Sequence, residues 1–356
     1  MNLRVLCLSN MWPGPANPDY GAFVAEMCTA LEGLGMRVDP VVIDTRAHGP
    51  ARTPAKYAKL TATAARHARR ADVIYAHYLF PTAAVAAGAA RAARIPYVVT
   101  AHGQDVRNLD RPAVRRASAG PLRSAAEVIA VSEHLAEGLR ASGLTLPPVS
   151  VVNMGVDMTR FRPADRDVAR AWLGLPADVP VVLAVGGLTD RKNPLGLLQA
   201  FARVRAAHPS AILAFVGDGP LAGAVDQGAR RLGLAGGVVR PGALPHGAVA
   251  DWIAACDVLA LVSRVEPLGV VALEAMASGR PVVATRVGGT AEVVPDPAAG
   301  RIVDPLDPVA IGTAILDVLA DPPTADACRA AAEPHALTRQ AARVAAILTR
   351  VVEAHP

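Results

Sequence analysis

The chain has 356 residues, of which 52% are hydrophobic and 19% are charged, and its formal net charge is +5. This composition excludes a disordered chain, and the length suits two globular domains better than one. The basic excess lies in residues 1–160, which hold 18 Lys and Arg against 12 Asp and Glu, but aromatic residues do not alternate with them, which argues against nucleic-acid binding.

Short β-branched runs alternate with alanine-rich stretches along the chain. The first series of predicted strands is Arg4–Ser9, Val38–Ile43, Val73–His77, Tyr97–Thr100, Val128–Val131 and Val149–Val152. The second is Val181–Val185, Ile212–Val216, Val238–Arg240, Val258–Leu261, Val282–Ala284 and Gly300–Val303. Continuous apolar strands separated by helices predict parallel sheets covered on both faces. Two series of this kind predict two doubly wound α/β domains.

The predicted boundary falls near Phe161 and Pro163, giving domains of residues 1–161 and 162–336. Asp165 is expected to be the N-cap of a helix that ends at Gly174. Residues 337–354 are expected to form a single helix, and the segment 337–356 to pack back on the N-terminal domain. In open parallel sheets ligands bind beyond the carboxyl ends of the strands, so the cleft between the domains is the expected site.

Cellular location is predicted from what the sequence lacks. The apolar run at the N-terminus is shorter than a signal peptide requires, and no uninterrupted apolar span has membrane-crossing length. The four cysteines are far apart in the sequence and are expected to be buried thiols of a reducing compartment. We therefore expect a cytoplasmic protein. Its basic N-terminal half is either a solvated face or a contact with something anionic, such as a phosphate-bearing acceptor or the inner membrane leaflet.

The strongest chemical motif is EPLGVVALEAMASG, which covers Glu266–Gly279. A loop carrying Glu266 follows a predicted strand, and a helix begins at about Gly269 and stops at Gly279. The free backbone N–H groups at a helix start suit a phosphate or sugar hydroxyls. Glu274 lies among apolar neighbours, where a buried carboxylate needs partners such as ribose hydroxyls. The two carboxylates are therefore expected to line one cavity.

With this motif the sequence resembles glycosyltransferase family 4, a retaining family of GT-B architecture, over nearly the whole chain. The resemblance implies two Rossmann-like domains facing each other across a cleft, with the nucleotide-sugar bound by the C-terminal domain. It implies that Glu274 binds the nucleotide ribose and that Glu266 contacts the donor sugar. The backbone of the loop that follows Glu266 is implied in donor binding as well, and its residues are Pro267, Leu268, Gly269 and Val270.

Three further segments of the second half fit the same family. GGLTDRKN (186–193) resembles its G-x-L-x-x-x-K-N loop, in which Gly187 contributes backbone and Arg191 and Lys192 hold the donor diphosphate. Two adjacent cations would offset the charge that builds on the departing diphosphate. GDGP (217–220) resembles a family turn with a mainly structural role. RPGALP (240–245) falls where the base-binding loop of the family lies, so that backbone atoms near Arg240 and Leu244 are expected to read the base.

The first half carries the remaining motifs. Residues 10–13 and 21–24 resemble the N-terminal glycine loop of the family, in which Gly21 lets backbone approach the donor phosphate. The segment TAHGQD (100–105) follows a predicted strand and matches the family pattern T-x-H-G-x-D. The resemblance places His102 beside the anomeric centre, and Asp105 on the acceptor side, where it either fixes the loop or orients His102. The segment 153–157 (NMGVD) departs from the usual P-N-G-V-D, so the hydrogen bonding of the missing Asn is in doubt.

No metal and no cofactor are expected. Asp165 and Asp167 form a D-x-D pair, but they open a helix, where acidic residues suit the positive end of the helix dipole. Charge on the leaving group would instead be balanced by Arg191, Lys192 and helix N-termini, with His102 and Glu266 completing the catalytic group. We expect no nucleic-acid partner.

The predicted reaction moves a sugar from a nucleoside diphosphate to an acceptor with retention of configuration, the retention being implied by the resemblance. UDP-sugars are the first expectation for the donor and GDP-sugars the second. The acceptor is left open between a surface polysaccharide or lipid-linked glycan, as in the teichuronic-acid type, and a small natural product. The alternatives are a non-catalytic protein that binds sugar nucleotides and a GT-B epimerase or phosphorylase.

Overall fold

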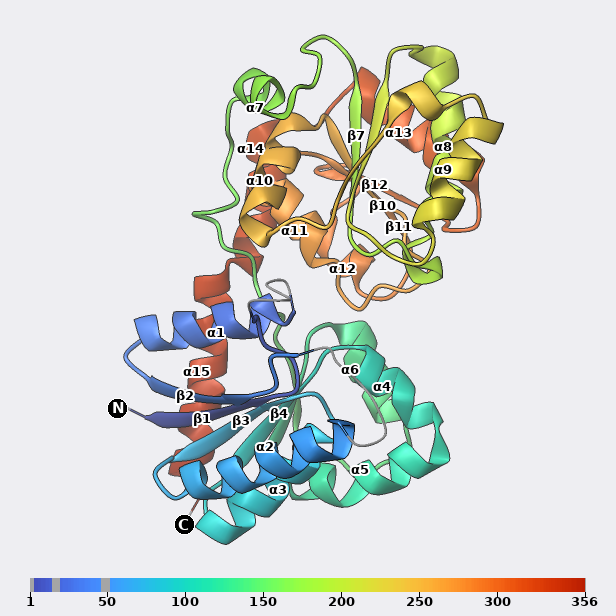
Figure 1. Ribbon diagram of the computed structural model, residues 1–356. Coiled ribbons are helices and arrows are strands. Elements are labelled where there is room, and N and C mark those ends of the chain that lie inside the picture. The colour runs from blue at the N-terminus through green and yellow to red at the C-terminus, as the bar shows by residue number, and fades with distance from the viewer. Residues whose placement is uncertain (1–2, 15–19, 46–51, 356) are drawn as a thin grey trace. The chain divides into compact units, whose positions relative to one another are not determined.

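The computed structural model describes residues 3–14, 20–45 and 52–355. Each of two compact units contains one six-stranded parallel sheet (Figure 1). Unit 1 comprises Met1–Gly155 and Leu337–Pro356, and unit 2 comprises Val156–Ala336. The division precedes the expected boundary because the segment after Gly155 belongs to the core of unit 2, in which Val156 and Phe161 are both buried.

The sheet of unit 1 has the order β2-β1-β3-β4-β5-β6. Its strands are β1 (Arg4–Ser9), β2 (Arg37–Val42), β3 (Val73–His77), β4 (Tyr97–Ala101), β5 (Glu127–Ala130) and β6 (Val149–Val151). The direction of winding reverses between β1 and β3, so the carboxyl ends of these two strands flank the usual ligand position of such a sheet. Buried valine and isoleucine in the central strands explain why the sequence forms a sheet covered on both faces.

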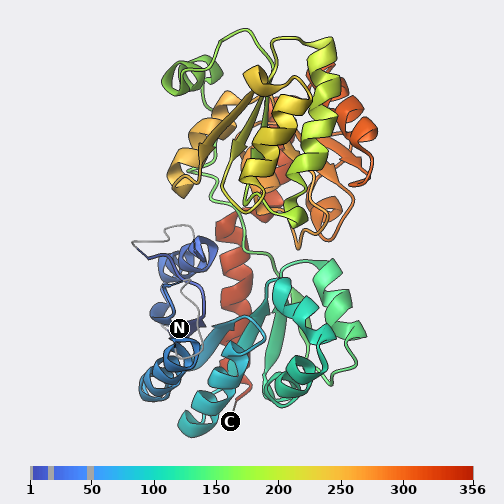
Figure 2. The same ribbon diagram turned by 45° about the vertical axis from the view of Figure 1, so that its right-hand side comes forward.

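Helices cover both faces of this sheet. They are α1 (Ala22–Gly33), α2 (Arg52–Ala68), α3 (Thr82–Ala93), α4 (Gln104–Arg107), η1 (Asn108–Asp110), α5 (Pro112–Ser124), α6 (Glu133–Ala141) and α15 (Leu337–Glu353). The right-handed crossover rule puts α1 on one face and α2, α3 and α5 on the other. In agreement, α3 packs against both α2 and α5, and α15 packs against α1 (Figure 2).

The C-terminal helix α15 is an integral part of unit 1. Its buried side chains, among them Val344 and Leu348, join the core of that unit. Arg350 Nη2 donates to Glu127 Oε2 over 2.6 Å, and Arg343 Nη2 donates to the Val151 carbonyl over 2.7 Å. These contacts tie the end of the chain to β5 and β6.

The sheet of unit 2 has the order β12-β11-β10-β7-β8-β9. Its strands are β7 (Val181–Val185), β8 (Ile212–Val216), β9 (Val238–Gly242), β10 (Val258–Leu261), β11 (Val282–Thr285) and β12 (Gly300–Val303). Here the winding reverses between β7 and β10, so the loops after these two strands share the ligand position.

The helices of unit 2 form two layers (Figure 1). They are α7 (Arg166–Leu173), η2 (Asp190–Lys192), α8 (Pro194–Ala207), α9 (Ala222–Arg231), η3 (Ala235–Gly237), α10 (His246–Ala255), α11 (Val270–Ala277), α12 (Thr290–Val293), α13 (Pro308–Ala320), α14 (Ala325–Ala332) and η4 (Glu333–His335). On one face α8 packs against α9 and α13, and on the other α10 packs against α7 and α11 against α14.

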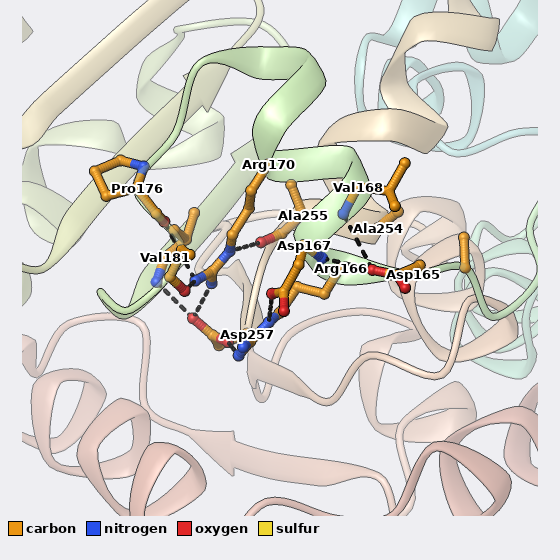
Figure 3. Close-up of polar contacts among 12 residues, drawn as sticks. Asp165, Arg166, Asp167, Val168, Arg170, Pro176, Val181, Ala254, Ala255 and Asp257 are labelled. Atoms are coloured by element: carbon orange, nitrogen blue, oxygen red, sulfur yellow. Dashed lines mark hydrogen bonds and ion pairs between the residues drawn. The ribbon is translucent and has the colours of Figure 1, made fainter.

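The N-terminal part of unit 2 is held in place by α7 and by the ion pair of Arg170 with Asp257. Asp165 caps α7 as expected, because its side chain accepts from the backbone N–H groups of Asp167 and Val168, and Gly174 ends the helix in the left-handed conformation. Arg170, on the inner face of α7, is 1% exposed, and its Nη2 donates to Asp257 Oδ2 over 2.6 Å (Figure 3).

All twelve predicted strands are present, with small shifts at their ends. β9 is longer than expected and includes Pro241, and β2 includes Pro40; both strands lie at sheet edges, where the missing N–H of proline leaves no central hydrogen bond unmade. The four cysteines are buried and free. Within the described residues, no helix is long and apolar enough to cross a membrane.

Candidate functional site

The carboxyl edge of the unit 2 sheet gathers the motifs of the second half where its winding reverses. Residues of β7 and β10 and of the loops that follow them line a small pocket, among them Gly186, Gly187, Lys192, Val262 and Ser263. The two loops are also joined directly, because the Arg264 N–H donates to the Arg191 carbonyl over 2.8 Å. Both loops follow strands, as the sequence predicts, and the strand order makes them neighbours.

Lys192 and Glu266 meet at this edge. Lys192 Nζ lies 2.6 Å from Glu266 Oε2, and Ser263 Oγ donates to the same oxygen over 2.9 Å. The Glu266 side chain is only 10% exposed, so a charged partner is needed to hold it there. Arg191, by contrast, is exposed. The lysine is thus positioned by Glu266, whereas the arginine projects from the loop.

The helix α11 starts beside this ion pair. Gly269 is its N-cap with φ 95°, and no side chain caps the first turn. A Cβ on Gly269 would lie 2.9 Å from Leu261 Cδ2, so a side chain there would clash with the strand β10. Leu268 is buried, and Pro267 and Val270 are half-buried. The uncapped first turn presents backbone N–H groups next to Lys192 and Glu266, which is the arrangement that suits an anion.

Glu274 lies further along α11 and has a different partner. Its Oε1 is 2.8 Å from His246 Nε2, and the carboxylate side chain is 8% exposed. His246 is the first residue of α10, and its Nδ1 lies 3.1 Å from Arg160 Nη1. The imidazole also contacts the ring of Phe161, with 5.3 Å between the ring centroids. Glu266, in the loop before α11, and Glu274, within α11, therefore belong to two separate hydrogen-bonded groups.

The predicted base-binding segment is partly committed to structural contacts. The Arg240 guanidinium makes two hydrogen bonds of 2.7 Å with the carboxylate of Asp226 on α9, and Leu244 packs on the core of unit 2. The ion pair raises the pKa of Arg240 and lowers that of Asp226. Asp226 thus holds the Arg240 side chain, and contact of backbone atoms near Arg240 and Leu244 with the base stays a prediction.

In unit 1, His102 follows β4 and lies in an aromatic surrounding. Its ring centroid is 5.1 Å from that of Phe23 and 4.6 Å from that of Tyr78. His102 Nε2 is 3.1 Å from Nδ1 of His77, the last residue of the neighbouring strand β3, and His77 is fully buried. Burial lowers the pKa of His102 to about 3 and places that of His77 well below its usual value. Both imidazoles are therefore neutral near pH 7, and one donates to the other.

Asp105 holds the loop that carries His102. Its carboxylate accepts hydrogen bonds from the backbone N–H groups of Leu79, His102, Gly103 and Val106, at 2.8 to 3.3 Å. Burial nevertheless raises the pKa of Asp105, and these four hydrogen bonds oppose the rise. Of the two roles left open for Asp105, the contacts favour fixing the loop.

Gly21 has a structural reason to be glycine. It is the N-cap of α1 with φ 74°, and a Cβ would lie 2.5 Å from the Met11 carbonyl oxygen. The close approach is thus to the protein's own backbone, and contact with a donor phosphate stays a prediction.

The departure at NMGVD has a clear local effect. Asn153 Oδ1 accepts from the Gly155 N–H over 2.9 Å, and Met154 is buried in the core of unit 1. Asp157 Oδ1 accepts from the N–H groups of Thr159 and Arg160, at 2.9 and 3.1 Å. The segment therefore forms the turn that leads into unit 2.

Two residues of the site were missed from the sequence. His77 ends a strand next to the strand that precedes His102, and His246 lies one residue beyond the segment singled out as base-binding. His77 could have been found as a histidine at the end of a predicted strand, as His102 was, but the sequence does not show that these two strands are neighbours. His246 begins a helix, and no sequence signal singles it out.

Comparisons with known proteins cover both units. The family described as Glycosyltransferase Family 4 matches residues 20–160, and that described as Glycosyl transferases group 1 matches residues 165–335. D-inositol 3-phosphate glycosyltransferase 1 of Catenulispora acidiphila is 35% identical over 285 residues, which are 74% of this chain and 68% of that protein.

A second relative matches over a shorter stretch. D-inositol 3-phosphate glycosyltransferase 2 of the same organism is 39% identical over 201 residues, which are 53% of this chain and 47% of that protein. The chain thus spans about half the length of this and several other relatives.

Among solved structures, Anabaena Alr3699/HepE in complex with UDP superposes with a TM-score of 0.80 and 24% identity, over 98% of this chain and 100% of that chain. At this identity the likeness is one of fold.

Proposed function

The chain belongs to glycosyltransferase family 4, and we propose that it transfers a sugar from a nucleoside diphosphate sugar to an acceptor. The observation that carries the proposal is the group formed by Lys192, Glu266 and the uncapped start of α11 where the winding of the unit 2 sheet reverses. A cation beside free backbone N–H groups suits a diphosphate. A neutral ligand would not need this arrangement.

Residues of unit 2 are proposed to bind each part of the donor. Lys192 and Arg191 bind the diphosphate, and the backbone of residues 267–270 binds phosphate and sugar. Glu266 keeps Lys192 in place and contacts the sugar, and Glu274 binds the ribose. The backbone of Gly187 lies near the phosphates. The backbone at Arg240 and Leu244 contacts the base. UDP is the favoured nucleotide, because solved structures of the same fold hold UDP and UDP-glucose. GDP is the second.

The reaction is proposed to proceed with retention, by same-face attack of the acceptor on the anomeric carbon. Within the described residues no group of three or more His, Cys, Asp and Glu is arranged to hold a metal. We propose that Lys192, Arg191 and the helix dipole offset the charge on the departing diphosphate. The diphosphate would then help to remove the acceptor proton. His102, neutral near pH 7, would contact the donor sugar through a hydrogen bond and not as a cation.

The acceptor is assigned to unit 1, and a phosphate-bearing polyol is the favoured class. Two observations support this: the relatives are named D-inositol 3-phosphate glycosyltransferases, and the first half of the chain carries the basic excess. Contact of this half with an anionic membrane face at the cytoplasmic side stays a prediction, which sedimentation with anionic and neutral vesicles would test.

Two variants test the donor assignment. Glu274→Ala should mainly weaken donor binding, and Lys192→Ala should mainly lower kcat. A thermal-shift screen with UDP, GDP, ADP and dTDP identifies the nucleotide first. Normal turnover of nucleotide-sugars by both variants would contradict the assignment, and consumption of nucleotide-sugar to give free nucleotide and epimerised sugar without an acceptor would favour an epimerase.

A further inference from the structure

Glu274 is held by a histidine whose own hydrogen bonding is set by an arginine. We infer that His246 is a positioning residue that fixes the Glu274 carboxylate for the ribose, and thereby contributes to selection of ribonucleotides over deoxyribonucleotides. The inference rests on the proposed function, since it takes Glu274 as the ribose ligand.

The polarity of the contacts follows from the chemistry of the three groups. Arg160 Nη1 lies 3.1 Å from His246 Nδ1, and a guanidinium can only donate, so Nδ1 must accept. A neutral imidazole that accepts at Nδ1 carries its proton on Nε2. His246 Nε2 therefore donates to Glu274 Oε1, over 2.8 Å.

The surroundings hold the His246 ring in this orientation. His246 is the first residue of α10. The ring rests against Phe161, which is 1% exposed, and Arg160 precedes Phe161 in the chain. Two consecutive residues, Arg160 and Phe161, thus supply the hydrogen-bond donor and the apolar support.

The second carboxylate oxygen of Glu274 is left for a ligand. Oε1 accepts from His246, while Oε2 has no hydrogen-bond partner among the described residues. A carboxylate has lone pairs for further donors, and the hydroxyls of a ribose are donors of the required kind. With His246 holding Oε1, the carboxylate is pre-oriented, so that less order is lost when the ribose binds.

A purely structural histidine would behave differently. If His246 only packed α10 against α11, its removal would change folding stability and weaken all nucleotides by a common factor. If His246 orients the ribose ligand, its removal must reduce the preference for a nucleotide with a 2′-hydroxyl. The ratio of two affinities therefore separates the roles.

The test compares UDP with 2′-deoxy-UDP by isothermal titration calorimetry on the full chain. We expect wild type to prefer UDP, and His246→Leu to lose about tenfold of this preference, as expected for one well-placed hydrogen bond to a charged group. His246→Gln, whose amide N–H can replace Nε2–H, should keep most of it. His208→Leu, at an exposed histidine of the same unit, is the matched control and should equal wild type.

The outcomes are distinct. An unchanged UDP to 2′-deoxy-UDP ratio in His246→Leu overturns the inference, whether or not both affinities fall together. Thermal melting of each variant verifies that it is folded, and Gln carries the test if Leu is not. If wild type binds neither UDP nor GDP, the proposed function has failed instead, and if it binds GDP, the same comparison is made with GDP and 2′-deoxy-GDP.

Discussion

Replacing Asp257 by alanine should destabilise unit 2 strongly, because it leaves the buried Arg170 without its counter-charge. Asp257 Oδ2 accepts from Arg170 Nη2 over 2.6 Å and from the Val181 N–H over 2.7 Å (Figure 3). Arg170 also donates from Nε to the Ala255 carbonyl over 2.9 Å, so the guanidinium cannot swing out to water without losing further bonds.

The magnitude follows from the burial of the pair. Arg170 is 1% exposed and Asp257 is 19% exposed, and removing one partner of such a pair costs about 3–5 kcal/mol. Since domains are stable by roughly 5–15 kcal/mol, a large share of the stability of unit 2 is at risk. For a unit of this size the melting temperature should fall by roughly 6–20 °C.

Thermal unfolding of the full chain, followed by tryptophan fluorescence, measures this, since Trp172 and Trp252 both lie in unit 2. The matched control is Arg166→Ala, because Arg166 Nη1 donates to the other oxygen of the same carboxylate over 3.0 Å but is 41% exposed. It should cost less than about 1 kcal/mol. Equal losses in Asp257→Ala and Arg166→Ala would refute the reasoning from burial.

Four further predictions concern the candidate site. Lys192→Ala should lower kcat about 10²–10³-fold, with a smaller change in the KM for the donor, in steady-state assays. Because burial lowers the pKa of His102 to about 3, this residue should bind no proton between pH 5 and 8, and the pH–rate profile should show no step that His102→Asn removes. Between about pH 6.5 and 3, His102 binds a proton in the unfolded chain but not in the folded one, so the free energy of unfolding should fall as the pH falls. The melting temperature of His102→Asn should therefore fall less over the same pH range. Gly21→Ala should melt lower than Gly35→Ala, since both have positive φ but only Gly21 faces a clash with Met11.

The strands could be predicted because the sequence signal for them is local. Runs such as Val181–Val185 and Ile212–Val216 are apolar throughout, and parallel strands buried on both faces require this. The sequence signal for the ends of α7 is equally local, since Asp165 and Gly174 themselves cap the helix. The boundary between the units has no such local signal, because Phe161 packs into the core of unit 2 through contacts distant in the sequence.

The site could be predicted only as a set of loops. Lys192, Glu266 and Glu274 were singled out by motif, but which side chains pair depends on strand order and helix packing. Lys192 and Glu266 meet although they are far apart in the sequence, and Glu274 pairs with His246, which the motif does not contain. Single histidines carry no such information until their neighbours in space are known.

An assay of sugar transfer decides whether the chain is a glycosyltransferase that uses nucleotide-sugars. The full chain is incubated with UDP-glucose and other nucleotide-sugars, with and without phosphorylated polyols, and the glycosylated product is followed by mass spectrometry. We expect release of nucleoside diphosphate that depends on the acceptor, an α-linked product by NMR, and loss of both in Glu274→Ala through weaker donor binding. Failure of every nucleotide-sugar to bind or react, or full activity in Glu274→Ala, would contradict this expectation.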